Sequence, residues 1–174
     1  LVLETLWSLP RYYSAKLALV GHSMGGMVAL DLIAGAPQEI DAMVLLATSP
    51  AFGRPDGAWQ QEYLAQRLSP LDAWRGMAKL APGHVRGMAS ADGAHDVVAR
   101  AALLMSAVPE ATYRAALHAI VGFDRRASLP EIRVPVLCLA GGDDRNAPPS
   151  VMSAMASRIE GAKYRCLPGV GHLA

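Results

Sequence analysis

The stretch "ALVGHSMGGMVALDLIAG", residues 18–35, decides the fold because its hydrophobic pattern changes period at a serine that lies among glycines. Residues 16–20 are almost all apolar, which is typical of a short strand buried on both faces of a parallel sheet. Over residues 27–34 the apolar positions follow helical spacing, and Gly35 suits the end of that helix. Ser23 therefore lies at a predicted strand-to-helix turn.

Three further apolar runs predict strands, and a helix is expected between the last two of them. The runs are "IDAMVLLATSP" at 40–50, "VPVLCLAGGDD" at 134–144 and "AKYRCLPG" at 162–169, with the helix over 150–159. Strands that alternate with helices indicate an α/β fold built on a parallel sheet.

The middle of the chain, residues 51–129, contains no convincing strand. Helices are expected over 57–68, 70–80, 94–107 and 110–121, separated by glycine and proline, and residues 1–9 are expected to end an amphipathic helix. A helical segment of this length between two sheet strands indicates an insertion over the sheet rather than a simple crossover connection.

The composition narrows the function classes. Of the 174 residues 52% are hydrophobic, and 16 basic residues stand against 15 acidic ones, for a net charge of +1. We expect one core, no nucleic-acid partner because no basic patch is seen, and no membrane span because no apolar run reaches the ~18 residues required. A phosphate-binding P-loop is not expected, because no Lys-Ser/Thr follows the glycines, and a metal is not expected, because no His/Asp/Glu cluster has metal-ligand spacing.

The two cysteines, Cys138 and Cys166, both lie in strand-like runs and form no Cys-x-x-Cys motif. We interpret them as two buried free thiols, which fits a reducing compartment and a cytoplasmic location. The first residues, "LVLETLW", lack the basic start and the cleavage site of a signal peptide, and they also lack an initiator Met.

The surroundings of Ser23 suit a nucleophile. A serine between a buried strand and a helix lies on a strained turn, and small residues two positions before and after it, here Gly21 and Gly25, let strand and helix approach, with Gly26 adding clearance. The turn lifts the hydroxyl above the sheet, and the Met24 N–H can bind an oxygen that becomes negatively charged. The alternative is a glycine-rich turn that only joins a strand to a helix.

A serine nucleophile needs a base, and the base needs an orienting carboxylate. His172 follows the last predicted strand in "LPGVGHLA", where glycines let the loop fold back over the strand ends. The His22 side chain is expected to point away from the Ser23 hydroxyl. Surface or packing roles are expected for the three histidines of the helical segment, His84, His95 and His118.

Two carboxylates are candidates for the acid, Asp143 and Asp144 in "AGGDDRNAPP", at the sheet edge where open α/β sheets place their sites. A turn that caps the helix after the two prolines would explain one aspartate equally well. It does not explain why serine, aspartate and histidine occur in this order, each just after its own strand.

These motifs resemble those of the α/β-hydrolase superfamily. "ALVGHSMGGMVALDLIA" is similar to its nucleophile elbow, "VPVLCLAGGDDRNAPP" to its acid loop and "LPGVGHLA" to its histidine loop. The resemblance implies that Ser23 is the nucleophile, that His172 is the general base and that the Met24 N–H is one oxyanion donor.

The resemblance also implies which aspartate orients the histidine. Family acid loops run Gly-x-x-Asp, and Gly141 sets that register for Asp144. Asp143 is the alternative if Gly142 sets the register instead.

By the same resemblance the chain divides into three parts: residues 1–50 with the nucleophile elbow, a helical cap over 51–129, and residues 130–174 with the acid and histidine loops. The sheet would be a partial, mostly parallel hydrolase sheet. Family members carry several strands and an oxyanion loop before the elbow and a helix after the histidine, so we expect a fragment cut at both ends. The second oxyanion donor would then be missing, which typically costs on the order of 10²–10³ in rate.

The stretch "YRAALHAIVGFDRRASLPEI" is similar to 3-oxoadipate enol-lactonases and related small-molecule hydrolases. This implies hydrolysis of a small ester or lactone through an acyl-enzyme without a cofactor. The alternatives are a C–C-bond hydrolase or cofactor-free perhydrolase with the same triad, and a non-catalytic binding protein on this fold.

The helical segment is expected to supply one wall of a mostly apolar pocket, with Trp59, Trp74 and Tyr113 as its large aromatic residues. Arg125 and Arg126 could bind a substrate carboxylate, although an exposed arginine pair near a helix end is the favoured interpretation.

Overall fold

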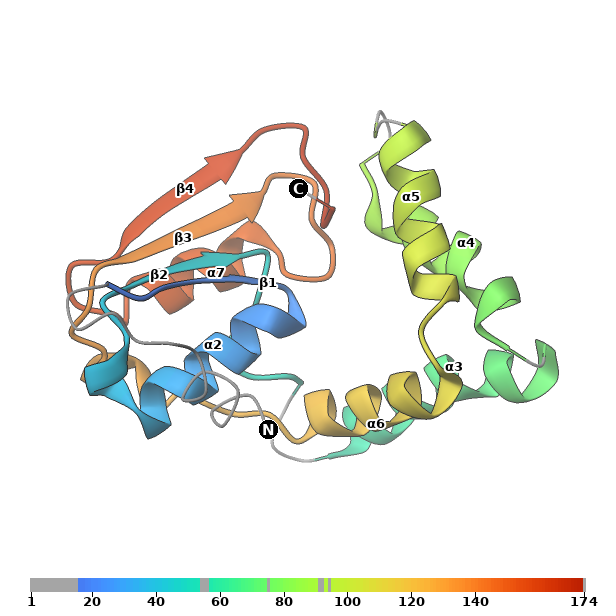
Figure 1. Cartoon of the computed structure of the whole chain (residues 1–174), viewed down its shortest axis with the longest axis horizontal. Helices are drawn as coiled ribbons and strands as arrows, with labels where there is room; N and C mark the ends of the chain where they lie inside the picture. Colours follow the sequence, from blue (N-terminus) through green and yellow to red (C-terminus); the bar gives the residue numbers. More distant parts are fainter. Residues whose placement is uncertain (1–15, 54–56, 75, 91–92, 94, 174) are drawn as a thin grey trace.

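The computed structural model describes residues 16–53, 57–74, 76–90, 93 and 95–173, apart from the side chain of Trp74. The helix expected over residues 1–9 lies outside these residues. The described part is a parallel sheet with two helices packed on it and a group of four helices beside its end (Figure 1).

The sheet has four parallel strands in the order β1-β2-β3-β4, which confirms the predicted α/β fold. The strands are β1 (Ala18–His22), β2 (Ala42–Leu46), β3 (Val136–Gly141) and β4 (Lys163–Leu167). Their carboxyl ends lie at one edge, because the strands are parallel and paired without a large offset. His22, at the end of β1, pairs with Leu46, at the end of β2, and β2 in turn pairs with β3. The loops that follow the strands therefore meet at that edge.

Helices α2 (Met24–Gly35) and α7 (Pro149–Ala156) pack on the same side of the sheet (Figure 1). They enclose the main hydrophobic core, whose most deeply buried members include Leu30, Met43, Leu45 and Met152. Two short 3-10 turns, Pro37–Glu39 and Leu129–Glu131, lead into the second and third strands.

The two cysteines differ in burial. Cys138 on β3 is fully buried, as predicted, whereas Cys166 on β4 is exposed, so the expectation of two buried thiols is wrong for Cys166. β4 is an edge strand of the described sheet, and most of its residues are exposed, so an apolar run there does not imply burial. Both thiols are free.

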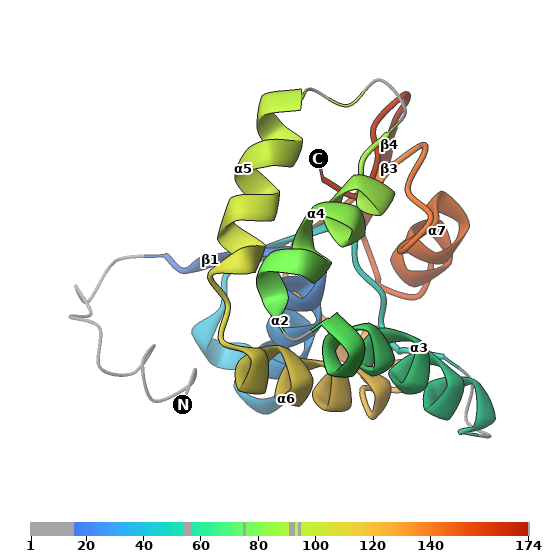
Figure 2. The same cartoon turned by 90° about the vertical axis from the view of Figure 1, so that its right-hand side faces the viewer.

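Between β2 and β3 the chain forms α3 (Ala58–Trp74), α4 (Met77–Met88), α5 (His95–Ser106) and α6 (Glu110–Val121), which we call the helical insertion. Figure 2 shows α4 beside α5 and α3 beside α6. The sequence predicted a helix end before Pro70, but α3 continues through it. Leu71, the next residue, is buried in a small second core with Met77 and Leu80, and this packing outweighs the hydrogen bond that proline cannot donate.

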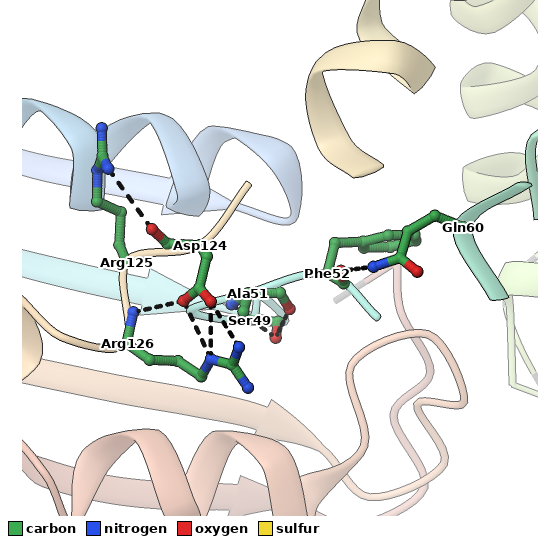
Figure 3. Close-up of polar contacts among 7 residues, drawn as sticks. All are labelled: Ser49, Ala51, Phe52, Gln60, Asp124, Arg125 and Arg126. Carbon is green, nitrogen blue, oxygen red and sulfur yellow. Dashed lines mark hydrogen bonds and ion pairs between the residues drawn. The ribbon is translucent and has the colours of Figure 1, made fainter. Parts of the chain in front are cut away.

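The chain enters and leaves the helical insertion at adjacent positions. The Phe52 N–H donates to the Phe123 carbonyl oxygen at 3.0 Å, and the Arg125 N–H donates to the Pro50 carbonyl oxygen at 2.7 Å. Between them Ala51 and Asp124 form an antiparallel bridge (Figure 3). Among the helices of the described residues, none has the length and hydropathy required to cross a membrane.

Candidate active site

Ser23 sits between β1 and α2 with φ 52° and ψ −121°, a left-handed backbone that a non-glycine residue rarely adopts. Hydrogen bonds hold it there. Its N–H donates to the Leu46 carbonyl oxygen at 2.9 Å, which extends the strand pairing, and its own carbonyl oxygen accepts from the Gly26 N–H at 2.9 Å. The Thr48 hydroxyl donates to the same carbonyl oxygen at 2.6 Å.

Two glycines make this turn possible: Gly21, as the sequence pattern predicted, and Gly26 rather than Gly25. A Cβ on Gly21 would lie 2.5 Å from the Gly25 carbonyl oxygen, and one on Gly26 would lie 2.6 Å from the Thr48 side chain. A Cβ on Gly25 would meet nothing within 4 Å, so the expectation that Gly25 must be small is wrong. Counting residues from the serine does not reveal which side of the first helical turn faces the sheet.

His172 brings its ring to Ser23 from the loop after β4. Its Nε2 lies 2.8 Å from the Ser23 Oγ and its Nδ1 lies 2.8 Å from the Asp144 Oδ2. The His172 side chain is almost fully buried, and its backbone N–H donates to the Met88 carbonyl oxygen of α4 at 2.9 Å. The helical insertion therefore helps to hold the histidine loop.

Asp144 is buried and completes this chain of hydrogen bonds. Its Oδ1 accepts from the backbone N–H groups of Asn146, at 2.8 Å, and Ala147, at 3.0 Å. Burial alone would raise the pKa of Asp144, but the hydrogen bonds from His172 and from these N–H groups outweigh it, and the pKa lies below its ordinary value. The carboxylate is thus ionised and oriented toward His172.

The structure brings Asp144 rather than Asp143 to the histidine. The Asp143 side chain is exposed, and its backbone N–H donates to the Val170 carbonyl oxygen at 2.9 Å. Met24 is the first residue of α2, so its N–H is among those that have no partner within the helix.

A cavity of about 520 Å³ lies over Ser23 and His172. Loops of the sheet edge and the first turn of α2, which includes Met24, form one wall, and the helical insertion forms the other. Trp59 and Tyr113 both line it, whereas the side chain of Trp74 lies outside the described structure. Most of the lining is apolar, which suits a small organic ligand.

The remaining histidines have different surroundings. The Nε2 of His22 bonds the backbone carbonyl oxygen of His172 at 2.7 Å, so its side chain is directed to the histidine loop rather than to the Ser23 hydroxyl. His95 and His118 are exposed, as expected. His84 is half-buried and lines the cavity beside Arg67, a position that the sequence pattern did not reveal.

Arg125 and Arg126 form ion pairs outside this cavity. Arg125 pairs with Asp31 of α2. Arg126 pairs with Asp124 at 2.5 Å, as Figure 3 shows. All four side chains are about half exposed, and neither arginine lines the cavity. This agrees with the favoured interpretation of an exposed arginine pair and leaves the carboxylate-binding alternative without support.

Sequence reasoning missed three residues that contact the site: Thr48, Arg67 and His84. Thr48 had a usable signal, because "ATSP" follows β2 at the same sheet edge as the other candidates. No three His, Cys, Asp or Glu side chains of the described residues come together in a way that could hold a metal ion.

Comparison with known proteins identifies the family. The family described as serine aminopeptidase, S33 matches residues 7–174. The pimeloyl-[acyl-carrier protein] methyl ester esterases of Nitrosomonas europaea and Aromatoleum aromaticum are each 30% identical to this chain, over 94% and 87% of it. The chain spans 66% and 65% of the length of these two esterases.

Solved structures of hydrolases are also similar to this chain. A hydrolase from Pseudomonas aeruginosa is 30% identical with a TM-score of 0.81, over 98% of this chain and 62% of that one. The enol-lactonase from Burkholderia xenovorans is 26% identical with a TM-score of 0.79, over 99% of this chain and 63% of that one. This chain therefore belongs to the serine aminopeptidase S33 family of α/β-hydrolases.

Proposed function

We propose that this chain carries the reaction centre of a serine hydrolase that cleaves ester or lactone bonds in small molecules. The observation that supports this most directly is the chain of two 2.8 Å hydrogen bonds, Ser23 to His172 and His172 to Asp144, on the floor of a mostly apolar cavity. Relatives named as methyl ester esterases and as an enol-lactonase favour carboxylic ester and lactone substrates over other acyl compounds.

In the first half-reaction, the Ser23 Oγ attacks the carbonyl carbon while the His172 Nε2 takes the hydroxyl proton. The resulting imidazolium is stabilised by the ionised Asp144, and the Met24 N–H donates to the new oxyanion. His172 then returns its proton to the departing alkoxide oxygen, which leaves as the alcohol, and the acyl group remains on Ser23. In a lactone the alcohol stays attached to the acyl chain.

Water completes the cycle. His172 takes a proton from a water molecule while the water oxygen attacks the acyl carbon. The tetrahedral intermediate that forms then collapses and releases the carboxylic acid. The proton on His172 passes to the Ser23 Oγ, which regenerates the starting hydroxyl. Asp144 stays ionised throughout because its hydrogen bonds lower its pKa.

A fluorophosphonate probe tests the proposal, because it phosphonylates only a serine whose hydroxyl is activated. The chain is compared with Ser23→Ala and with Ser49→Ala, a matched control whose hydroxyl also lines the cavity but donates to the Ala51 carbonyl oxygen instead of to a histidine. Intact mass should show one adduct on the parent and on Ser49→Ala, and none on Ser23→Ala.

Circular dichroism accompanies the labelling so that each result has one meaning. A folded chain that takes up no probe would overturn the hydrolase proposal and favour the non-catalytic binding protein. An adduct that persists in Ser23→Ala would assign the nucleophile to another residue.

A further inference from the structure

The charged side chains that line the cavity are all basic. Arg67 on α3 and Arg145 beside Asp144 contribute to the lining, and of the described residues no aspartate or glutamate does. Arg145 is exposed, whereas Arg67 is half-buried in the wall formed by the helical insertion. A cation in this position makes the apolar space attractive to a negatively charged group.

Arg67 is held in place by groups that do not neutralise it. Its Nη1 donates to the Nδ1 of His84, and its guanidinium lies over the Tyr63 ring, 5.1 Å from the ring centroid. Within the described part of the chain no carboxylate forms an ion pair with Arg67. An arginine stays protonated at all accessible pH values, and a half-buried charge without a counter-ion is costly unless a ligand supplies one.

His84 does not provide a negative charge and does not compete for an anion. Because guanidinium groups only donate hydrogen bonds, the Nδ1 that faces Arg67 must be an unprotonated acceptor. Burial, then the charge of Arg67 and then His172 lower the pKa of His84 to about 4, so the ring is neutral near pH 7. His84 and His172 line the same cavity, so this wall faces the reaction centre.

A second donor lies on the same wall. The Tyr113 hydroxyl is buried and finds no hydrogen-bond partner among the described residues, and the Tyr113 ring stands edge-on to His84 with centroids 6.3 Å apart. Burial raises the pKa of this phenol, so it keeps its proton and can donate. A buried hydroxyl without a partner is uncommon in folded proteins and indicates a ligand group in that place.

We propose that Arg67 and Tyr113 form an anion subsite in the helical insertion that binds a carboxylate of the substrate, away from the bond that is cleaved. The inference rests on the hydrolase proposal and deepens it: the preferred substrates are esters or lactones that carry a free carboxylate. A carboxylate fits better than a phosphate dianion, because a single half-buried guanidinium matches one negative charge in a planar, two-oxygen geometry.

Matched esters test the subsite. Hemi-methyl esters of linear dicarboxylic acids of increasing length are compared with neutral isosteres in which an isopropyl group replaces the carboxylate. The measured quantity is the ratio of kcat/KM for the anionic ester to that for the neutral one. Because both rates scale with the amount of folded protein, this ratio is insensitive to partial unfolding of a variant.

The parent should favour the anionic ester, and Arg67→Gln should lower the ratio about 10- to 100-fold, the effect expected for a charge-assisted hydrogen bond. Arg67→Lys retains the charge without the planar geometry and should give an intermediate ratio. Arg100→Gln removes an exposed arginine of α5 that does not line the cavity, and this variant should show the same ratio as the parent. An equal ratio in the parent and Arg67→Gln would overturn the subsite.

Binding separates this inference from the proposed reaction. Calorimetry on Ser23→Ala measures the affinity for the hemi-ester without turnover, and adding Arg67→Gln should weaken it by a similar factor. If the parent hydrolyses the neutral ester and shows no preference for the anionic one, the subsite proposal is overturned and the hydrolase proposal stands. If binding depends on Arg67 but the parent hydrolyses neither ester, the hydrolase proposal is overturned and the subsite proposal stands. Absence of Arg67-dependent binding would overturn the subsite.

Discussion

His22, the residue directly before Ser23, donates a hydrogen bond from its Nε2 to the backbone carbonyl oxygen of His172 at 2.7 Å. The centroids of the His22 and His172 rings lie 5.2 Å apart. The last residue of β1 thus connects the turn that carries Ser23 to the loop that carries His172, so the two loops are fixed to each other as well as to the sheet.

We expect His22→Phe to slow the reaction of Ser23, because the ring would keep its bulk but lose the bond that positions the His172 loop. A single hydrogen bond of this kind contributes about 0.5–1.5 kcal/mol, so the rate of fluorophosphonate labelling should fall about 2- to 10-fold. His118→Phe, at an exposed position of α6, is the control. Equal labelling rates in the two variants would show that His22 does not position the base.

The glycines of the turn should differ in their effect on stability. Gly21→Ala forces a methyl group against the backbone at 2.5 Å and should lower the free energy of unfolding by about 1–3 kcal/mol or more. Gly25→Ala adds the same methyl group in open space on α2 and should be neutral or stabilising by up to about 1 kcal/mol. Urea unfolding measures both variants, and a similar loss in both would contradict the packing described for the turn.

The pKa of His84 makes stability depend on pH. The folded chain holds this ring neutral down to about pH 4, whereas the unfolded chain protonates it near pH 6.5. The unfolded state therefore binds more protons between these values, and stability is lost as the pH falls through this window.

His84→Gln keeps a hydrogen-bond acceptor for Arg67 and removes the titration. The free energy of unfolding of the parent should fall by on the order of 1–2 kcal/mol more than that of His84→Gln between pH 7 and pH 4, after allowance for the partial exposure of the ring. If the free energy of unfolding depends on pH in the same way in the parent and in His84→Gln, the lowered pKa of His84 is contradicted.

The two thiols should differ in reactivity. Burial raises the pKa of Cys138 to about 11, so it is neither accessible nor ionised near pH 8, whereas Cys166 is exposed. Iodoacetamide should therefore modify one thiol of the folded chain and both in denaturant, and Cys166→Ser should leave the folded chain unmodified. Rapid modification of folded Cys166→Ser would show that β3 opens to solvent.

The meeting of Ser23, Asp144 and His172 could be predicted because each residue follows its own strand. Parallel strands place their carboxyl ends at one edge, so chain order alone brings the three loops together. Arg67 and His84 could not be predicted, because they meet only when α3 and α4 pack together, and no local pattern encodes that packing.

The errors have similar causes. Gly25 and Gly26 could not be distinguished without knowing which side of α2 faces Thr48. Cys166 lies in an apolar run that looks like a buried strand, and its exposure depends on which neighbours the strand has. Pro70 was expected to end a helix, but the burial of Leu71 beside it maintains α3.

The adjacent entry and exit of the helical insertion have an evolutionary consequence. Because Ala51 bridges Asp124, the segment that follows β2 is joined to the segment that precedes β3, whatever lies between residues 52 and 123 (Figure 3). Helices can be lengthened, replaced or rearranged there at little cost to the sheet, since loop length has a weak effect on stability. The histidine loop depends on this segment through a backbone carbonyl, that of Met88, which any residue can supply. Under the proposed function, the choice of substrate can therefore change with these helices while Ser23, Asp144 and His172 keep their places at the sheet edge.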